Sequence, residues 1–230
     1  MSRLASFRGP STPSASPAQY KQPASPSKGA ESTFHRKLKN YLLELRAIAD
    51  AWDDLVLIDG LKAAKGLVDT RTELENALSA IPNRRPRTRV VGPKLALIEK
   101  HISELDVVVR KLVQQKLFRR MNTVMDNMEV LLIEAQKAKG WQWVEEEPMW
   151  LTWSLAKFVS SFACIVPPYH RSLALHADLV DKLRSNSISF QDSRDAITGW
   201  VEQPWLEESG WNSQWEDICA IEVERWQSLR

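Results

Sequence analysis

Two long stretches of the chain repeat apolar residues with the spacing of an α-helix. Steps of four and three residues place the first set on one stripe: Leu38, Leu42, Leu45, Ala49, Trp52 and Val56. The second stretch carries two such runs with a register slip between them: Leu95, Ile98, Ile102, Leu105, Val109 and Leu112, then Leu117, Met121, Val124, Met128, Leu131 and Ala135. Stripes of this kind need other helices to cover them, so the pattern favours an all-α fold.

A segment rich in proline and arginine separates the two stretches. Four residues in it interrupt a helix: Pro82, Pro86, Gly92 and Pro93. We therefore expect a connector over residues 81–93 and a second helix from Pro93 or Lys94 to Lys139. Two long helices joined in this way predict an antiparallel hairpin or short coiled coil over residues 33–140.

The first of these helices contains two glycines in its middle. We expect it to begin at Ser32 or Thr33, where a hydroxyl can cap the first turn. Its apolar pattern continues less regularly to Leu78, and Gly60 and Gly66 weaken the helix between. A bend or a break is therefore expected there.

Residues 1–32 are rich in Ser, Pro and Ala and hold few large apolar residues. Such a segment buries too little surface to offset its chain entropy, which predicts a disordered tail. Thr12, Ser16 and Ser25 each precede a proline, and Ser25-Pro26-Ser27-Lys28 resembles a cyclin-dependent kinase site. These three residues are candidate phosphorylation sites, although a Ser/Pro-rich composition also produces such pairs by chance.

The charge of +2 is unevenly distributed along the chain. Residues 141–230 hold 7 basic and 14 acidic residues, and the preceding residues hold 24 and 15. The connector contributes a basic cluster, which is a candidate nuclear-import or RNA-phosphate patch: Arg84, Arg85, Arg87 and Arg89. A solvated loop has the same composition, and no aromatic residues alternate with the arginines. Direct nucleic-acid binding is therefore not expected.

Nine of the ten tryptophans lie in the last 90 residues. Helical patterns begin there near Trp153, Tyr169, Ser189 and Trp211, which predicts a compact Trp-rich helical region over residues 141–230. In the last helix, one face is expected to hold Trp215, Ile218, Ile221 (or Glu222) and Trp226. Indole rings fill cores but also concentrate at interfaces, so both uses are open. The region is expected to pack on the open end of the hairpin or on a partner.

No arrangement of residues indicates catalysis or a bound cofactor. The four histidines form no HExxH or His/Cys pattern, so we expect no metal site. No glycine-rich phosphate loop or nucleophile motif occurs. The two isolated cysteines predict buried free thiols in a reducing compartment. No apolar run approaches the ~20 residues that span a bilayer, so no membrane contact is expected.

The C-terminal region carries three recognisable motifs. They are Thr152-Trp153-Ser-Leu-Ala-Lys-Phe158, Tyr169-His-Arg-Ser-Leu-Ala-Leu175 and Trp200-Val-Glu-Gln203-Pro204-Trp205-Leu-Glu207. In their order and intervals they resemble the cyclin-dependent kinase 2-interacting protein family, of which the chain would be a divergent, fungal-like member. The resemblance is clearest over residues 150–209.

The resemblance implies a small helical scaffold of the nucleus with no activity of its own. It implies protein partners: a cyclin-dependent kinase, factors of DNA replication and the cell-cycle checkpoint, or an AAA ATPase complex that matures the large ribosomal subunit. A hetero-oligomer is expected. We expect partner binding at the motif residues Trp153, Phe158, Tyr169, Trp200, Gln203, Pro204 and Trp205, because indole and phenol rings supply wide rigid contact area.

Two other classes of function remain open from the sequence. A structural coiled-coil subunit of a kinetochore-type or tethering complex would assemble through the Leu95–Ala135 stripe. An RNA-binding protein would use the arginine connector, and its affinity would fall steeply with salt.

Overall fold

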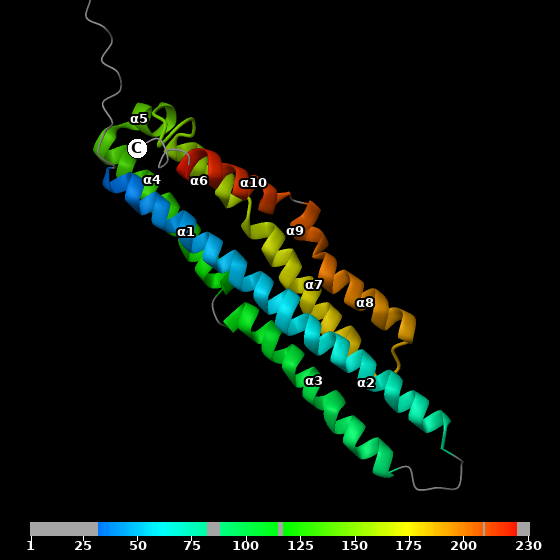
Figure 1. The fold of residues 1–230 in the computed structure, drawn as a ribbon. Helices are drawn as coiled ribbons and strands as arrows, with labels where there is room; N and C mark the ends of the chain where they lie inside the picture. The colour runs from blue at the N-terminus through cyan, green and yellow to red at the C-terminus, as the bar shows by residue number, and fades with distance from the viewer. Residues whose placement is uncertain (1–31, 82–87, 115–116, 209, 225–230) are drawn as a thin grey trace, which may run out of the picture.

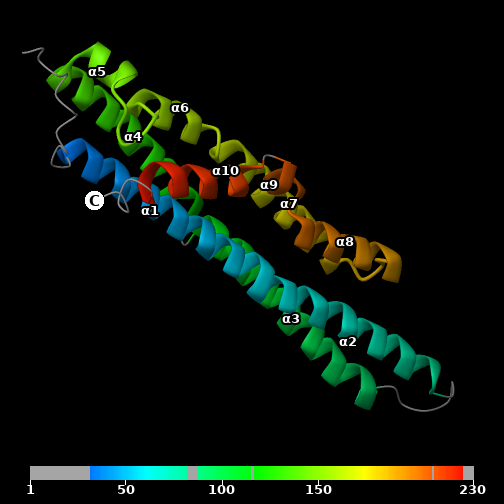
Figure 2. The same ribbon diagram turned by 45° about the horizontal axis from the view of Figure 1, so that its top comes forward.

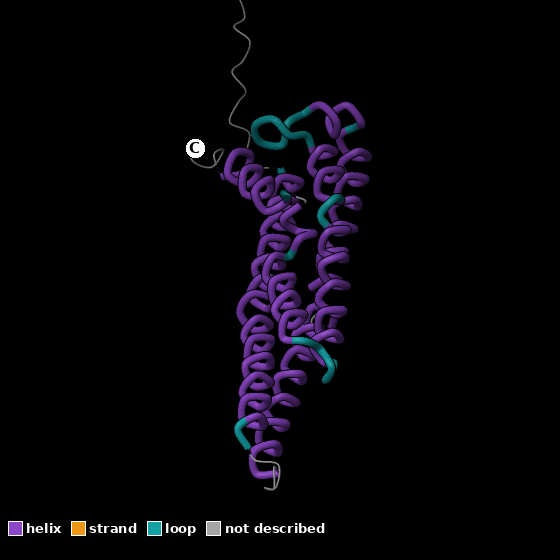
Figure 3. Tube along the Cα trace, turned by 90° about the vertical axis from the view of Figure 1, so that its right-hand side faces the viewer, coloured by secondary structure: helices purple, strands orange, loops and turns teal. Residues whose placement is uncertain are grey.

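The computed structural model describes residues 32–81, 88–114, 117–208 and 210–224 of the chain. Thr12, Ser16 and Ser25 lie outside these ranges, as do Arg84 and its neighbours Arg85 and Arg87. The described residues are almost all helical and include no strand, only an isolated bridge between Pro148 and Ser154 (Figure 3). The predicted all-α class is confirmed.

The first row of the fold is one long helical path. Helix α1, Thr33–Asp53, begins where the Ser32 hydroxyl accepts the His35 N–H. A π-helical segment η1, Asp54–Gly60, follows it, and α2, Leu61–Ser79, continues the path. Gly60 and Gly66 therefore do not break the helical path. Instead, the helix changes from the α-helical to the π-helical repeat over η1.

The second row consists of α3, Thr88–Gln114, and α4, Leu117–Lys139. The division between them matches the register slip seen in the sequence. The predicted start at Pro93 or Lys94 is wrong, because α3 begins at Thr88 and contains Pro93. Proline removes only one hydrogen bond this close to a helix start, and the preceding Gly92 has no Cβ to clash with the proline ring.

The two rows form the predicted antiparallel hairpin, with α1 beside α4 and α2 beside α3 (Figure 1). Their facing stripes supply much of the core. Its buried members from the first row include Leu38, Leu42, Leu45, Ile48 and Trp52. Those from the second row include Leu105, Leu112, Met121, Met128 and Leu131.

The rest of the described chain, from residue 141 onward, forms two more rows along the hairpin. The third row is α5, Trp141–Glu146, α6, Leu155–Ala163, and α7, Val166–Arg184. The fourth is α8, Phe190–Glu202, α9, Pro204–Glu208, α10, Trp211–Ile218, and the π-helical segment η2, Cys219–Glu224. Helix α7 packs on α3 and α4, and α8 packs on α7 and α2, which closes an up-and-down bundle (Figure 2).

The Trp-rich region therefore extends farther than its expected position at the open end of the hairpin. It begins there with α5 and then runs along the hairpin to the end of α7. The Arg71 guanidinium donates to the Arg184 carbonyl, and Arg184 pairs with Asp106, so these contacts mark where the third row ends. Beyond them α2 and α3 continue alone as a two-helix tip, here defined as residues 72–79 and 88–97.

Candidate functional site

The motif residues around Trp200 meet side chains of α1 and α7 in the middle of the bundle. We call this set the central cluster: Trp52, Tyr169, His176, Trp200 and Gln203. All five are buried. They come from the first, third and fourth rows, so the cluster joins parts of the chain that are distant in sequence.

Trp200 lies against the π-helical segment. Its indole N–H donates to the Val56 carbonyl at 2.9 Å. The same carbonyl receives the Leu61 N–H at the end of η1. Gly60 leaves the space for the ring, because a Cβ there would lie 2.4 Å from Trp200 Cζ2. The glycine that weakens the helix thus allows an indole to approach the backbone.

Gln203 connects the end of α8 to α1. Its backbone is left-handed, with φ 40°, and the proline that follows disfavours the right-handed helical conformation at this position. Its side-chain Oε1 accepts the Trp52 indole N–H at 3.2 Å, and its Nε2 donates to Asp53 Oδ1 at 3.2 Å. Its carbonyl accepts the Leu206 N–H at 2.8 Å. A non-glycine residue is held in this conformation when its surroundings fix it, as these bonds do.

Burial shifts the pKa values of the ionisable groups in and beside the central cluster. Burial, with the nearby charges of Asp53 and Asp50, raises the pKa of the Tyr169 phenol well above its usual range. Burial also raises the pKa of Asp53, although the hydrogen bond from Gln203 opposes this. Tyr169 meets the Trp52 ring edge-on, with ring centroids 5.1 Å apart.

His176 is a neutral side chain inside the bundle. Its Nδ1 lies 2.7 Å from the Ser172 carbonyl, and because a carbonyl only accepts, Nδ1 carries the proton. Burial lowers the pKa of His176, and this hydrogen bond opposes the effect only in part. The ring meets Trp200 edge-on, with ring centroids 4.6 Å apart, and a backbone interaction with Trp200 also partly opposes the lowering of the pKa of His176. These contacts give His176 a packing role beside Trp200.

A second aromatic group lies near the open end of the hairpin. Phe158 is fully buried and contacts Trp150 edge-on at 5.5 Å and Trp153 at 5.2 Å. Trp153 is half-buried, and the Lys157 ammonium lies 4.7 Å from its ring centroid. Thus Phe158, Tyr169 and Trp200 lie inside the molecule, and Trp153 lies at its edge.

The carboxylate of Glu222 in η2 binds the loop before α6. Oε2 accepts the backbone N–H groups of Leu151, Thr152 and Trp153 at 3.2, 3.0 and 3.3 Å. Oε1 accepts the Thr152 hydroxyl. Burial by itself would raise the pKa of Glu222, but these four bonds favour the charged form and hold the pKa below its ordinary value. The contact is therefore lost as the pH falls through that lowered pKa.

Pro204 and Trp205 are the motif residues that reach the surface. Pro204 is exposed, and Trp205 is 38% exposed. The Arg171 guanidinium lies 5.3 Å from the Trp205 ring centroid. Of the predicted basic patch, Arg89 is described, and it lies exposed in the first turn of α3.

Sequence reasoning missed several residues that organise these contacts. Gly60 had a usable signal, since a glycine inside a helical stripe often marks a close approach. The signal for Glu222 was weak, because the helical pattern allowed either Ile221 or Glu222 on the expected face. The π-helical repeat of η2 buries Glu222, which is 2% exposed, and leaves Ile221 exposed. The predicted burial of both cysteines is wrong, since Cys164 is exposed and Cys219 is half-buried.

Over the described ranges, no group of three or more His, Cys, Asp or Glu side chains could hold a metal ion. No helix in those ranges has the length and apolarity needed to cross a membrane. In comparisons with known proteins, no protein-family model matches the chain, and no curated protein matches its sequence.

Proposed function

We propose that this protein is a non-enzymatic nuclear adaptor that binds protein partners through the outer face of α8 and α9. The proposal rests on one observation, an apolar stripe on that face. Phe190 is 56% exposed, Val201 is 42% exposed, and Trp205 is 38% exposed. Residues 190 and 201 are eleven apart, which is three helical turns, so they share a face of α8. Trp205 lies beyond the left-handed Gln203, on α9.

The stripe has the composition of an interaction surface. Large apolar side chains in a row on a surface are typical of binding sites, and tryptophan is enriched among the residues that dominate interface energies. Acidic side chains outnumber basic ones around the stripe, since Asp195, Glu202, Glu207 and Glu208 are exposed beside the exposed Arg194. We therefore expect a partner surface that combines apolar and basic groups.

The identity of the partners follows from the resemblance of the motifs at residues 150–209. We propose a cyclin-dependent kinase with replication or checkpoint factors, or an AAA ATPase complex of large ribosomal subunit maturation. Of the motif residues, Trp205 and Pro204 are in a position to touch such a partner directly. The buried Tyr169, Trp200 and Gln203 would act by holding α8 and α9 in place, whereas Phe158 packs with Trp150 and Trp153 near the open end of the hairpin.

The coiled-coil subunit is a weaker alternative. It would use the Leu95–Ala135 stripe to bind another chain, but most of that stripe is covered by the chain's own helices. Leu105, Leu112, Met121 and Leu131 are among its buried members. No comparable observation favours RNA binding.

The test compares two triple substitutions in the tagged full-length chain. Phe190→Ser with Val201→Ser and Trp205→Ser removes the stripe. The matched control is Leu95→Ser with Leu97→Ser and Val113→Ser, which changes exposed apolar residues of α3. We expect quantitative mass spectrometry of nuclear purifications to show about tenfold less kinase or ATPase with the first variant and unchanged recovery with the control.

Far-UV circular dichroism would check that both variants keep their helices. Equal recovery of kinase and ATPase with both variants would contradict the proposed surface. A purified wild-type chain with neither partner at any level would contradict the proposed family role.

A further inference from the structure

The loop that binds Glu222 has the properties of a carboxylate-recognition site. Three successive backbone N–H groups, from Leu151 to Trp153, converge on one oxygen, and the Thr152 hydroxyl binds the other. Such converging N–H groups form an anion-binding concavity and are a known way to hold a peptide carboxylate. Among the described residues no basic side chain forms an ion pair with Glu222, so neutral donors carry the recognition.

An aromatic contact accompanies the carboxylate contact. Trp215 lies seven residues before Glu222 and meets the Phe162 ring edge-on, with centroids 4.7 Å apart. Trp215 and Val223 are nearly buried. The segment formed by α10 and η2, residues 211–224, thus docks through an aromatic residue, a glutamate and an aliphatic residue.

This docking leaves polar groups unsatisfied. The indole N–H groups of Trp150 and Trp215 are both buried and have no hydrogen-bond partner. A buried donor without an acceptor weakens the docked state relative to one in which both donors are paired. A segment that offers acceptors to these indoles, or that lacks the second indole, would bind the same loop better.

The segment has little helical stability of its own. It is 14 residues long, with α10 spanning eight residues and η2 six, and helices of this length are marginal by themselves in water. Gly210, with φ 61°, precedes it and provides a joint between α9 and α10. The docking contacts therefore hold residues 211–224 in place.

We infer that loop 151–153 and Phe162 form a docking site for an acidic amphipathic partner segment, and that residues 211–224 are its exchangeable intramolecular occupant. The partner segment carries an aromatic residue and, seven positions later, a glutamate. The inference rests on the proposed binding role and names the chemistry of one partner element. It uses a different surface from the α8–α9 stripe, so each can fail without the other.

The experiment uses the full-length chain and a labelled synthetic peptide with the sequence of residues 211–224 and an amidated C-terminus. Fluorescence anisotropy measures its affinity. We expect weak binding to the wild-type chain, whose own segment competes, and about tenfold tighter binding to Glu222→Gln, whose segment is loosened. The matched control Asp217→Asn removes an exposed charge from the same segment and should bind as weakly as wild type.

Two further measurements test the site itself. Adding Thr152→Val to Glu222→Gln should weaken peptide binding about fivefold, because one donor is lost. A peptide in which the glutamate is replaced by glutamine should bind the Glu222→Gln chain about tenfold more weakly than the acidic peptide.

Equal affinity of the peptide for the wild-type and Glu222→Gln chains, or no binding to either, would overturn the inference. Equal binding of the acidic and the glutamine peptides would overturn carboxylate recognition. A concentration-dependent wild-type dimer in sedimentation that Glu222→Gln dissociates would show that a second copy occupies the site, and would overturn the assignment to a partner.

Discussion

The central cluster and the two-helix tip use the same long helices but differ in how many neighbours those helices have. Around Trp200 the first row has neighbours in the second, third and fourth rows, and its side chains Trp52, Leu55 and Val56 are buried. In the tip, α2 has α3 beside it, and Leu95 is 50% exposed although it begins an apolar run. The same periodicity thus gives a closed core in one region and a half-covered pair in the other.

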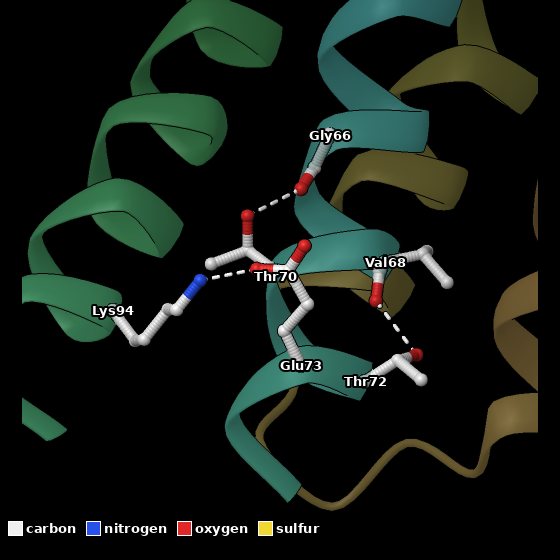
Figure 4. A network of polar contacts seen from close by, with 6 residues as sticks. All are labelled: Gly66, Val68, Thr70, Thr72, Glu73 and Lys94. Carbon is white, nitrogen blue, oxygen red and sulfur yellow. Dashed lines mark hydrogen bonds and ion pairs between the residues drawn. The ribbon is translucent and has the colours of Figure 1, made fainter. Parts of the chain in front are cut away.

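The two regions also differ in how far apart in the sequence their hydrogen-bonded residues lie. In the central cluster, Gln203 joins residues about 150 positions apart. At the base of the tip and within it, Thr70 and Thr72 donate to the carbonyls of Gly66 and Val68 on their own helix, as Figure 4 shows. The Lys94–Glu73 ion pair is the contact there that joins the two helices. Long-range bonds therefore concentrate where several rows meet.

The largest expected effect is that of Trp200→Ala. The change removes a fully buried indole and its bond to Val56, and should lower the free energy of unfolding by about 3–5 kcal/mol. The matched change in the tip is Leu95→Ala, at a side chain that is 50% exposed, and should cost under about 0.5 kcal/mol. Urea unfolding followed by circular dichroism measures both. Similar losses would remove the distinction between the regions.

Gly60→Ala tests the close packing of the central cluster by adding a single methyl group beside Trp200. The new Cβ would lie 2.4 Å from Trp200 Cζ2, and overpacking of this kind costs about 1–3 kcal/mol. In the control Gly199→Ala the nearest atom is Leu179 Cδ1 at 3.9 Å, so the change should stabilise the helix by up to about 1 kcal/mol. Thermal unfolding should therefore shift in opposite directions. A shift in the same direction would contradict the close approach of Trp200.

Asp53 makes the central cluster sensitive to pH. Its pKa is raised in the folded protein, chiefly by burial, so the folded state holds this proton more tightly than the unfolded chain. Stability should therefore fall as the pH rises from about 4 through the raised pKa. Asp53→Asn should remove this dependence of stability on pH. It should also raise the free energy of unfolding at neutral pH, by less than Gly60→Ala lowers it.

The control for that prediction is Asp69→Asn, which removes an exposed charge from α2. Urea unfolding at several pH values should show the Asp69→Asn chain keeping the wild-type slope over this range. An unchanged slope in Asp53→Asn would show that its carboxyl is solvated.

The smallest expected effect belongs to Lys94→Gln in the tip. The ion pair with Glu73 is largely exposed, and such pairs contribute about 0–1 kcal/mol. We expect a loss under about 0.5 kcal/mol that disappears at high salt, with faster amide hydrogen exchange confined to residues 72–79 and 88–97. A larger loss, or faster exchange in α1, would show that the tip is coupled to the central cluster.

Several parts of this fold could be predicted from the sequence because they depend on local periodicity. Residues recurring every three or four positions identify a helix and its buried face, and so Leu38, Leu105 and Met121 were placed correctly. The start of α3 could not be predicted, because Pro93 fits the first turn of a helix as well as a place just inside one, and the structure has it as the sixth residue of α3. Gly92 permits the helix, because a residue without a Cβ can adopt the helical conformation before a proline.

The candidate site was predicted less completely. The motifs brought attention to Trp200, Gln203 and Trp205, but an aromatic residue at helical spacing fits a core and an interface equally well. Which one applies depends on what covers it, and that is decided by the packing of rows distant in the sequence.

The sequence by itself determined where the helices lie and which of their faces are apolar, because both follow from interactions within a few residues. Only the tertiary structure decided that Trp200 is core, that Gly60 makes room for it, and that Glu222 binds loop 151–153. Each of these joins positions about 70 to 150 residues apart, so none of them follows from interactions within a few residues.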